Sequence, residues 1–263
     1  MTLQFSISDK NYDGMTKRLS TELCKIHDWS IANRLTINVA KTEVIIFSNR
    51  KHDCSDLQVM LGDDSSLNFS SSCKFLGIKV DNRLNFRDHI SFIFGKISRN
   101  TGILYNIRNN LNLKAKINFY YAFIYPYLSY NVIIWGSTSK THLEPVIIQQ
   151  KRIVRILNNS AFRDHTSPIF RSLNLLKIQD IHKFSILVHM HKKFNDNNFR
   201  VSHSINTRNR NLANPVFHRL TVTQQAVSFK GPLYWNNLPV NLREIKSLPA
   251  FKFHLKKYLI SQY

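Results

Sequence analysis

Apolar and polar residues follow one pattern up to about Asp81 and a different pattern after it. Before Asp81 the apolar runs are short. Residues 44–47 have the length of a buried strand, and residues 57–61 alternate apolar and polar side chains as a half-buried strand does. Residues 62–65 (Gly-Asp-Asp-Ser) favour a turn, because glycine tolerates positive φ and aspartate bonds its own backbone. The pattern predicts a small antiparallel sheet.

Two more strands and one helix are predicted in the same part of the chain. Residues 75–78 (Phe-Leu-Gly-Ile) have the composition of a strand with an internal glycine, which marks a bulge or a close approach of another backbone or a ligand. Residues 1–7 have the composition of another strand. Asp9 is a good helix cap, and apolar residues then recur at three- and four-residue spacing until about Asn33.

Beyond Asp81 the spacing becomes helical. We expect one helix from Asn85 or Asp88, a second from Leu113 to about Tyr125 that Pro126 bends or ends, and a third from Leu143 with a capping box at Thr141. Further expected elements are a helix over 176–194, a basic loop over 195–225, a compact turn around Trp235 and an amphipathic helix over 247–258. The predicted fold class is α+β.

An uncharged stretch, residues 117–139, raises the alternative of a membrane-spanning helix. Pro126 interrupts it, as do the polar residues Asn118, Ser129 and Asn131. A spanning helix needs about 20 mostly apolar residues. We therefore expect a buried pair of helices broken near Pro126, and no membrane partner.

The charge balance indicates a polyanionic partner. The chain has 37 Lys and Arg against 16 Asp and Glu, a net charge of +21. Such an excess suits nucleic acid or an acidic membrane surface, and the 12% aromatic content favours nucleic acid because rings stack on bases. The alternative, that the charge only aids solubility, is the weaker explanation because acidic residues do this better.

Cysteine and histidine positions predict neither disulfides nor a metal site. Cys24, Cys54 and Cys73 are an odd, scattered set, so we expect a reducing, intracellular compartment. Of the histidines between residues 182 and 191, only His182 and His189 share a helix face, and no cysteine or carboxylate stands nearby at ligand spacing.

The order of motifs in residues 35–81 resembles the end of the palm domain in reverse transcriptases of non-LTR (LINE-type) retrotransposons, jockey-like or CR1-like. The segment 38–42 (Asn-Val-Ala-Lys-Thr) is similar to motif D of that family, and residues 75–78 with Asp81 are similar to motif E, the primer grip. The similarity continues to the C-terminus. It implies that Lys41 assists the leaving pyrophosphate, although a solvated lysine entering a strand is an equal alternative.

The same resemblance bears on catalysis. Members of the family hold Mg²⁺ through aspartates that precede the segment resembling residues 1–33, and these aspartates are not in this chain. Because two-metal nucleotidyl transfer requires such carboxylates, we expect that this chain alone binds no cofactor and does not polymerise DNA. Asp63 and Asp64 are no replacement, since they follow Lys41 instead of preceding it and stand where a hairpin turn is expected.

The resemblance also divides the chain. It implies a partial palm over 1–81, a helical thumb over 82–160, a helical connection over 161–194, a basic loop or linker over 195–225 and a helical tail over 226–263. A thumb holds a template–primer duplex of RNA and DNA by its phosphates, which requires cations. The expected nucleic-acid contacts are Phe75, Leu76, Gly77, Lys96, Arg99, Lys151, Arg152 and Arg155.

Three functions remain open. The resemblance favours part of an RNA-directed DNA polymerase that holds template and primer, located in the nucleus or the cytoplasm. The alternatives are a non-enzymatic RNA- or DNA-binding protein and an inert product of a decayed element. The last would aggregate, because a palm that lacks strands leaves sheet edges unpaired.

Overall fold

The computed structural model describes residues 4–9, 11–48, 58–61, 65–195, 213, 219 and 221–263. They belong to two compact units, Met1–Leu84 and Asn85–Tyr263. The first unit holds one long helix and two antiparallel strand pairs, and the second is helical. This mixture confirms the α+β class, while the assignment of palm and thumb stays a prediction.

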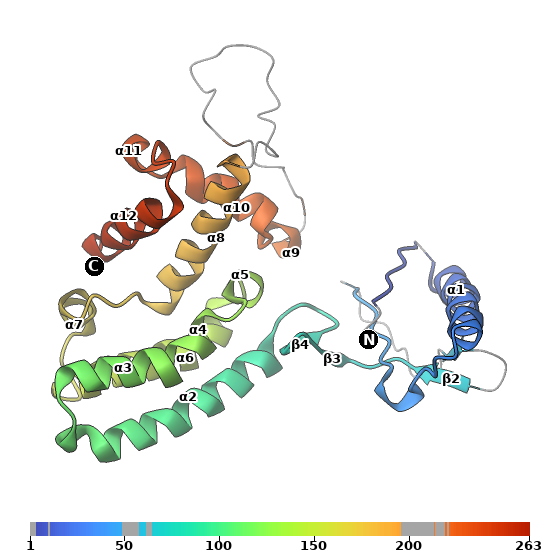
Figure 1. The fold of residues 1–263 in the computed structure, drawn as a ribbon, viewed down its shortest axis with the longest axis horizontal. Coiled ribbons are helices and arrows are strands. Elements are labelled where there is room, and N and C mark those ends of the chain that lie inside the picture. Colours follow the sequence, from blue (N-terminus) through green and yellow to red (C-terminus); the bar gives the residue numbers. More distant parts are fainter. Residues whose placement is uncertain are drawn as a thin grey trace, which may run out of the picture. The chain divides into compact units, whose positions relative to one another are not determined.

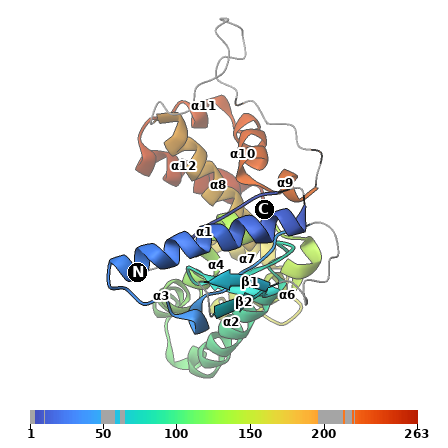
Figure 2. The same ribbon diagram turned by 90° about the vertical axis from the view of Figure 1, so that its right-hand side faces the viewer.

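In the first unit, a long helix covers a hairpin. Its elements are α1 (Tyr12–Ala32), η1 (Val39–Lys41), β1 (Gln58–Leu61), β2 (Ser65–Asn68), β3 (Ser72–Phe75) and β4 (Ile78–Asp81). Helix α1 packs on β1, as Figure 2 shows. Val59, Leu61 and Leu67 are buried, and Leu19 and Leu23 of α1 pack against them. Val59 and Leu67 are paired across the strands, so the hairpin presents one apolar side to the helix.

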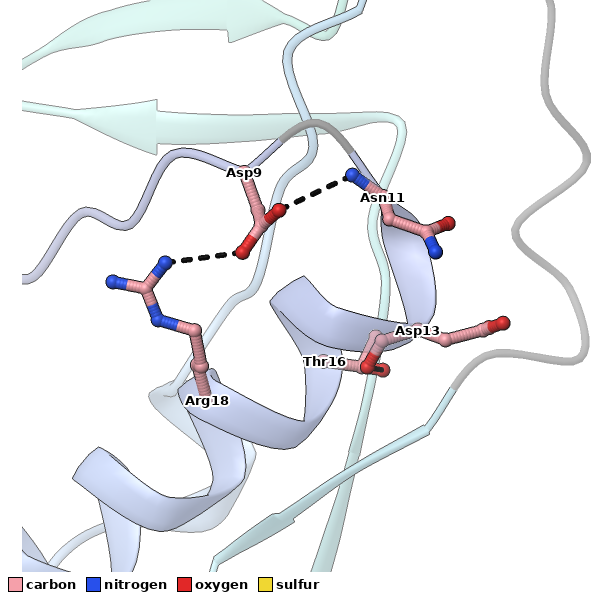
Figure 3. A network of polar contacts seen from close by, with 5 residues as sticks. All are labelled: Asp9, Asn11, Asp13, Thr16 and Arg18. Atoms are coloured by element: carbon pink, nitrogen blue, oxygen red, sulfur yellow. Dashed lines mark hydrogen bonds and ion pairs between the residues drawn. The ribbon is translucent and has the colours of Figure 1, made fainter.

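Asp9 fixes the segment that leads into α1 (Figure 3). Its carboxylate accepts a hydrogen bond from the backbone N–H of Asn11 at 3.2 Å and forms an ion pair with the guanidinium group of Arg18 at 3.0 Å. Asn11, not Asp9, holds the N-cap position. Asp9 therefore acts two residues before the N-cap and joins the segment that leads into α1 to the second turn of the helix.

Two predicted strands are absent from the described part of the first unit. Residues 44–47 make a single bridge, between Val44 and Phe69, with the N–H of Ser70 donating to the carbonyl of Val44 at 2.7 Å. Val44 packs against the apolar core of the hairpin. Packing against this core, and not pairing with a neighbouring strand, therefore explains the apolar side chain at this position. Residues 4–9 form no strand either. The predicted turn at 62–65 lies mostly outside the described residues, and so do Asp63 and Asp64.

The second unit is a helical assembly. Its elements are α2 (Arg87–Ile107), η2 (Arg108–Asn110), α3 (Leu113–Phe123), α4 (Tyr125–Ser129), α5 (Val132–Trp135), α6 (Lys140–Leu157), α7 (Thr166–Ser172), α8 (Ile178–Asn195), α9 (Thr221–Gln224), α10 (Val227–Asn236), α11 (Val240–Arg243) and α12 (Leu248–Ser261). Helices α2, α3 and α6 lie side by side, and α8 leads from them to α10 and α12 (Figure 1). Ile90, Ile93, Ile97 and Leu104, which recur at helical spacing, form the buried stripe of α2.

The uncharged stretch is broken near Pro126, as predicted, but into three helices, α3, α4 and α5, and not into the expected pair. Pro126 lies in the first turn of α4, where its missing N–H costs nothing. Asn131 adopts a left-handed conformation before α5. Tyr120, Leu128 and Trp135 from the three helices are buried. Within the ranges that the structure describes, no helix is long and apolar enough to cross a membrane.

Two local predictions in the second unit were wrong. Ser139, and not Thr141, caps α6, since its side chain accepts from the N–H of His142. The predicted turn around Trp235 is the helix α10. Pro232 and Trp235 are buried in α10 as it packs on α8, and Trp235 stacks on Phe194 with ring centroids 4.7 Å apart. Tertiary packing thus holds a helix that proline and glycine disfavour locally.

Helix α5 and the segment after it cross α8 at very short range. Ser137 and His182 are both buried, and the Ser137 hydroxyl lies 3.1 Å from Nε2 of His182. A Cβ on Gly136 would lie 2.7 Å from Cδ2 of His182 and 2.6 Å from the Val132 carbonyl oxygen. Only glycine fits at this crossing without displacing the imidazole.

We expect Gly136→Ala to destabilise the chain by about 1–3 kcal/mol, because the added methyl group overpacks a buried crossing. Gly95→Ala is the control. Gly95 lies in the interior of α2 with open space at its Cβ position, so alanine there should stabilise by about 0.5–1 kcal/mol. Thermal denaturation of both variants checks this, and equal melting temperatures would contradict the close crossing.

His182 should make the chain acid-sensitive. Burial, with a smaller effect of the Lys230 charge, lowers the pKa of His182 from 6.5 to about 4. The unfolded chain therefore binds this proton first, so stability is full above pH 6.5 and falls as the pH drops from about 6.5 to 4. The loss should be about 3 kcal/mol.

Urea denaturation between pH 7.5 and 4 measures the effect of His182. The His182→Gln variant, which keeps a hydrogen-bonding side chain without the titration, should lose less stability over the same range than the wild type. Identical slopes for both proteins would show that His182 does not carry the acid sensitivity.

Candidate nucleic-acid interface

Lys41 ends a short turn that Asn38 builds. The side chain of Asn38 caps η1 by accepting from the Lys41 N–H at 3.2 Å. The Thr42 hydroxyl donates to the Asn38 carbonyl at 2.9 Å. Lys41 is exposed. The spacing of these three residues therefore has a local structural reason, and it presents the ammonium group to solvent whether or not a ligand is bound.

Phe75, Leu76 and Gly77 form the tip of the β3–β4 hairpin, so the predicted strand over 75–78 was wrong. Phe75 pairs with Ile78, which leaves Leu76 and Gly77 as a two-residue turn with φ of 45° and 81°. Turns with two positive φ values suit the twist of a hairpin and favour glycine or asparagine. Leu76 is unusual there, and it is 66% exposed.

The hairpin also carries a cysteine. The pKa of the Cys73 thiol in β3 is raised, first by burial and second by the charge of Glu43. The thiolate is the reactive form of cysteine, and a raised pKa disfavours it at Cys73.

Lys96 and Arg99 lie on α2, away from its buried stripe. Arg99 is exposed, and Lys96 is half-buried with its ammonium 5.5 Å from the ring centroid of Phe92. Phe92 is 41% exposed. The outer side of α2 thus combines cations with an exposed ring.

Lys151, Arg152 and Arg155 lie on the last turns of α6. Lys151 and Arg152 are exposed, whereas Arg155 is half-buried and donates through Nε to the carbonyl of Asp164 at 3.0 Å. Its guanidinium carbon also lies 5.9 Å from the ring centroid of Phe162, which is 81% exposed. Residues 145–157 contain no acidic residue, so all the charges on this part of α6 are positive.

The predicted residues divide between the two units. Lys41 and the hairpin tip belong to Met1–Leu84, while the cations of α2 and α6 belong to Asn85–Tyr263. The cations of each helix form a group by themselves, on two helices that pack against each other.

Net charge is divided very unequally between the units. Asn85–Tyr263 has 26 Lys and Arg against 6 Asp and Glu, a net charge of +20, while Met1–Leu84 has 11 against 10, a net charge of +1. All the ion pairs found among the described residues lie in the first unit. The exposed cations of the second unit, such as Arg99, Lys151 and Arg152, therefore have no carboxylate partner among the described residues and are available to a polyanion.

Sequence reasoning missed three contributors. Lys140 and Lys177 line a hollow together with the predicted Lys151. Phe162 was missed because it lies outside any periodic pattern. A charge count over separate parts of the chain would have located the basic unit, but only the tertiary structure brings residues 140, 151 and 177 to one hollow.

The described residues contain no group of three or more His, Cys, Asp or Glu side chains that could hold a metal ion. What the arrangement offers is cationic and aromatic side chains on helix faces in one unit, and an exposed lysine and an apolar hairpin tip in the other. Such surfaces bind phosphate backbones and stack on bases or sugars.

Leu76→Asn should stabilise the hairpin by about 1 kcal/mol, because asparagine tolerates the left-handed conformation that strains leucine. Leu35→Asn is the matched control, since Leu35 is also exposed but does not have a positive φ. Thermal denaturation should show a higher melting temperature for the first variant alone. A gain for neither variant would argue against strain at Leu76.

Comparison with known proteins finds relatives among the RNA-directed DNA polymerases of mobile elements. The chain is 27% identical over 168 residues to the RNA-directed DNA polymerase from mobile element jockey of Drosophila funebris, and 27% identical over 169 residues to that of Drosophila melanogaster. It is 22% identical over 170 residues to the probable RNA-directed DNA polymerase from transposon X-element of Drosophila melanogaster. Each match covers 63% of this chain and 18% of the relative.

No family model and no solved structure matches the chain. The chain spans about a fifth of the length of the curated relatives that it matches. The names of these relatives nevertheless agree with the resemblance inferred from residues 35–81. The chain is therefore homologous to part of the reverse transcriptases of non-LTR retrotransposons, and this prediction is confirmed.

Proposed function

We propose that this chain is the part of a non-LTR reverse transcriptase that holds the template–primer duplex of RNA and DNA. The observation that carries the proposal is the net charge of +20 in Asn85–Tyr263. A duplex is a dense polyanion, and a protein that neutralises its phosphates gains affinity by releasing counterions. The nucleus and the cytoplasm are the compartments in which such a protein would meet its substrate.

The helix faces suit binding to a backbone more than reading of bases. Lys151 and Arg152 project from one exposed face of α6, and Phe162 adds an exposed ring close to Arg155. Lysine and arginine on a helix surface reach phosphates without sequence preference, which is what a polymerase needs as the duplex moves. On α2, Lys96 and Arg99 add a second such face.

In the first unit, the hairpin tip and Lys41 would act on the primer end. Leu76 is exposed and apolar at a strained turn position, and strain of this kind is retained where a functional surface requires it. We assign Phe75, Leu76 and Gly77 to primer contact. Lys41, whose ammonium is exposed, would neutralise the leaving pyrophosphate in a protein that also holds the catalytic metal ions.

A second candidate is a non-enzymatic RNA- or DNA-binding protein. The concentration of charge in the second unit favours it, because this unit alone has the features of a binding module. Binding that survives Lys41→Gln and Gly77→Ala, but not the loss of α6 cations, would favour this candidate over a template–primer grip.

The test is the salt dependence of binding to an RNA–DNA duplex. The variant Lys151→Gln/Arg152→Gln should bind more weakly and should reduce the slope of log K against log salt by about 2, if each side chain contacts one phosphate. Fluorescence anisotropy at several salt concentrations measures the slope.

The control removes the same charge elsewhere. Lys192 and Lys193 are exposed on the last turn of α8, and Lys192→Gln/Lys193→Gln should leave the slope closer to that of the wild type. If both double variants lose the same affinity, the charge acts only as a diffuse field and α6 is not an interface. If the wild type binds no nucleic acid, the proposed function is wrong.

A further inference from the structure

A hollow in the second unit lies between α6, α7 and the start of α8. It encloses about 420 Å³. The side chains that line it include those of Lys140, Glu144, Lys151, Ser167 and Lys177. Pockets that hold small molecules have volumes of about 300–1,000 Å³, so this one has room for a single nucleotide but not for a duplex.

The floor of the hollow is held by buried hydrogen bonds. Gln150 is 2% exposed and its amide donates to the Leu176 carbonyl at 2.9 Å and to the Tyr120 hydroxyl at 3.2 Å. Its amide oxygen accepts from the N–H of Ile178 at 2.8 Å. Phe170 adds a buried ring. The hollow is therefore preformed, and binding in it would not require the floor to be ordered first.

The rim is cationic. Three lysines and one glutamate line the hollow, and among the described residues no carboxylate lies within ion-pair distance of the three ammonium groups. Lys177 instead donates to the Ser167 hydroxyl at 3.1 Å and lies 4.0 Å from the ring centroid of Tyr263. The ring face attracts the ammonium group and holds it beside the hollow.

The environment of Lys177 adds to this. Its pKa is lowered mainly by burial; Lys151 and Arg171 lower it further, and Asp180 opposes them. The neighbouring positive charges disfavour the protonated form of Lys177, and an anion bound among these cations would favour it.

We propose that this hollow binds one phosphate-bearing nucleotide of a nucleic-acid strand, with Lys140, Lys151 and Lys177 contacting the phosphate. Ser167 and Gln179, which also line the hollow, supply further polar groups, and Ile147 supplies an apolar wall for the sugar. The inference rests on the proposed function, since the nucleotide belongs to the strand that the unit holds. A strand end fits best, because its terminal phosphate carries more charge and can leave the duplex.

The experiment compares two single-stranded oligonucleotides that differ only in a 5′-phosphate. The wild type should bind the phosphorylated strand about tenfold more tightly, since a charge-assisted hydrogen bond is worth about one order of magnitude. Lys140→Gln and Lys177→Gln should each reduce this preference, and Lys192→Gln is the control with the same charge change. Inorganic phosphate should compete with the phosphorylated strand only.

The outcomes separate the two proposals. A 5′-phosphate preference that both pocket variants lose and the control keeps supports the nucleotide site. Equal binding of the two strands by a wild type that still binds an RNA–DNA duplex overturns the site and leaves the proposed function intact. Loss of preference in the control as well would overturn the site, because general charge would then explain the effect. Absence of all binding overturns both.

Discussion

One buried side chain, the amide of Gln150, connects three helices of the second unit. It lies on α6 and bonds to Tyr120 of α3 and to the backbone on either side of the start of α8, at Leu176 and Ile178. Loss of any of these hydrogen bonds would leave a buried polar group without a partner, which costs free energy of folding. The three helices are therefore held in one relative arrangement. Burial raises the pKa of the Tyr120 hydroxyl, which therefore stays a neutral partner for Gln150.

The hydrogen bonds of Gln150 also determine which side chains of α6 are exposed to solvent. Because Gln150 is adjacent to Lys151 on α6, fixing the amide inward fixes which side of the helix faces out, and Lys151 and Arg152 are on that side. The same amide forms the floor of the hollow beside Lys177. A neutral buried network thus supports a charged exterior, and the two are linked by the geometry of one helix.

The two units differ in net charge and in the interactions that stabilise them. The first unit is nearly neutral, and two of its cations form ion pairs, Arg18 with Asp9 and Lys25 with Glu22. The second concentrates positive charge that repels itself, and its stability depends on apolar packing such as that of Trp235 and Phe251 against α8. Binding of a polyanion would relieve the repulsion, which relates the net charge of this unit to its proposed role.

The sequence by itself determined the α+β class, the order of the long helices, the buried stripe of α2 and the break at Pro126, because these depend on local periodicity and on the missing N–H of proline. Motif order also determined the relationship to reverse transcriptases. Only the tertiary structure decided that residues 76 and 77 form a turn, that Val44 makes a single bridge, that Trp235 lies in a helix, and that Lys140, Lys151 and Lys177 share one hollow. These features arise from contacts between segments distant in the chain, which local patterns do not encode.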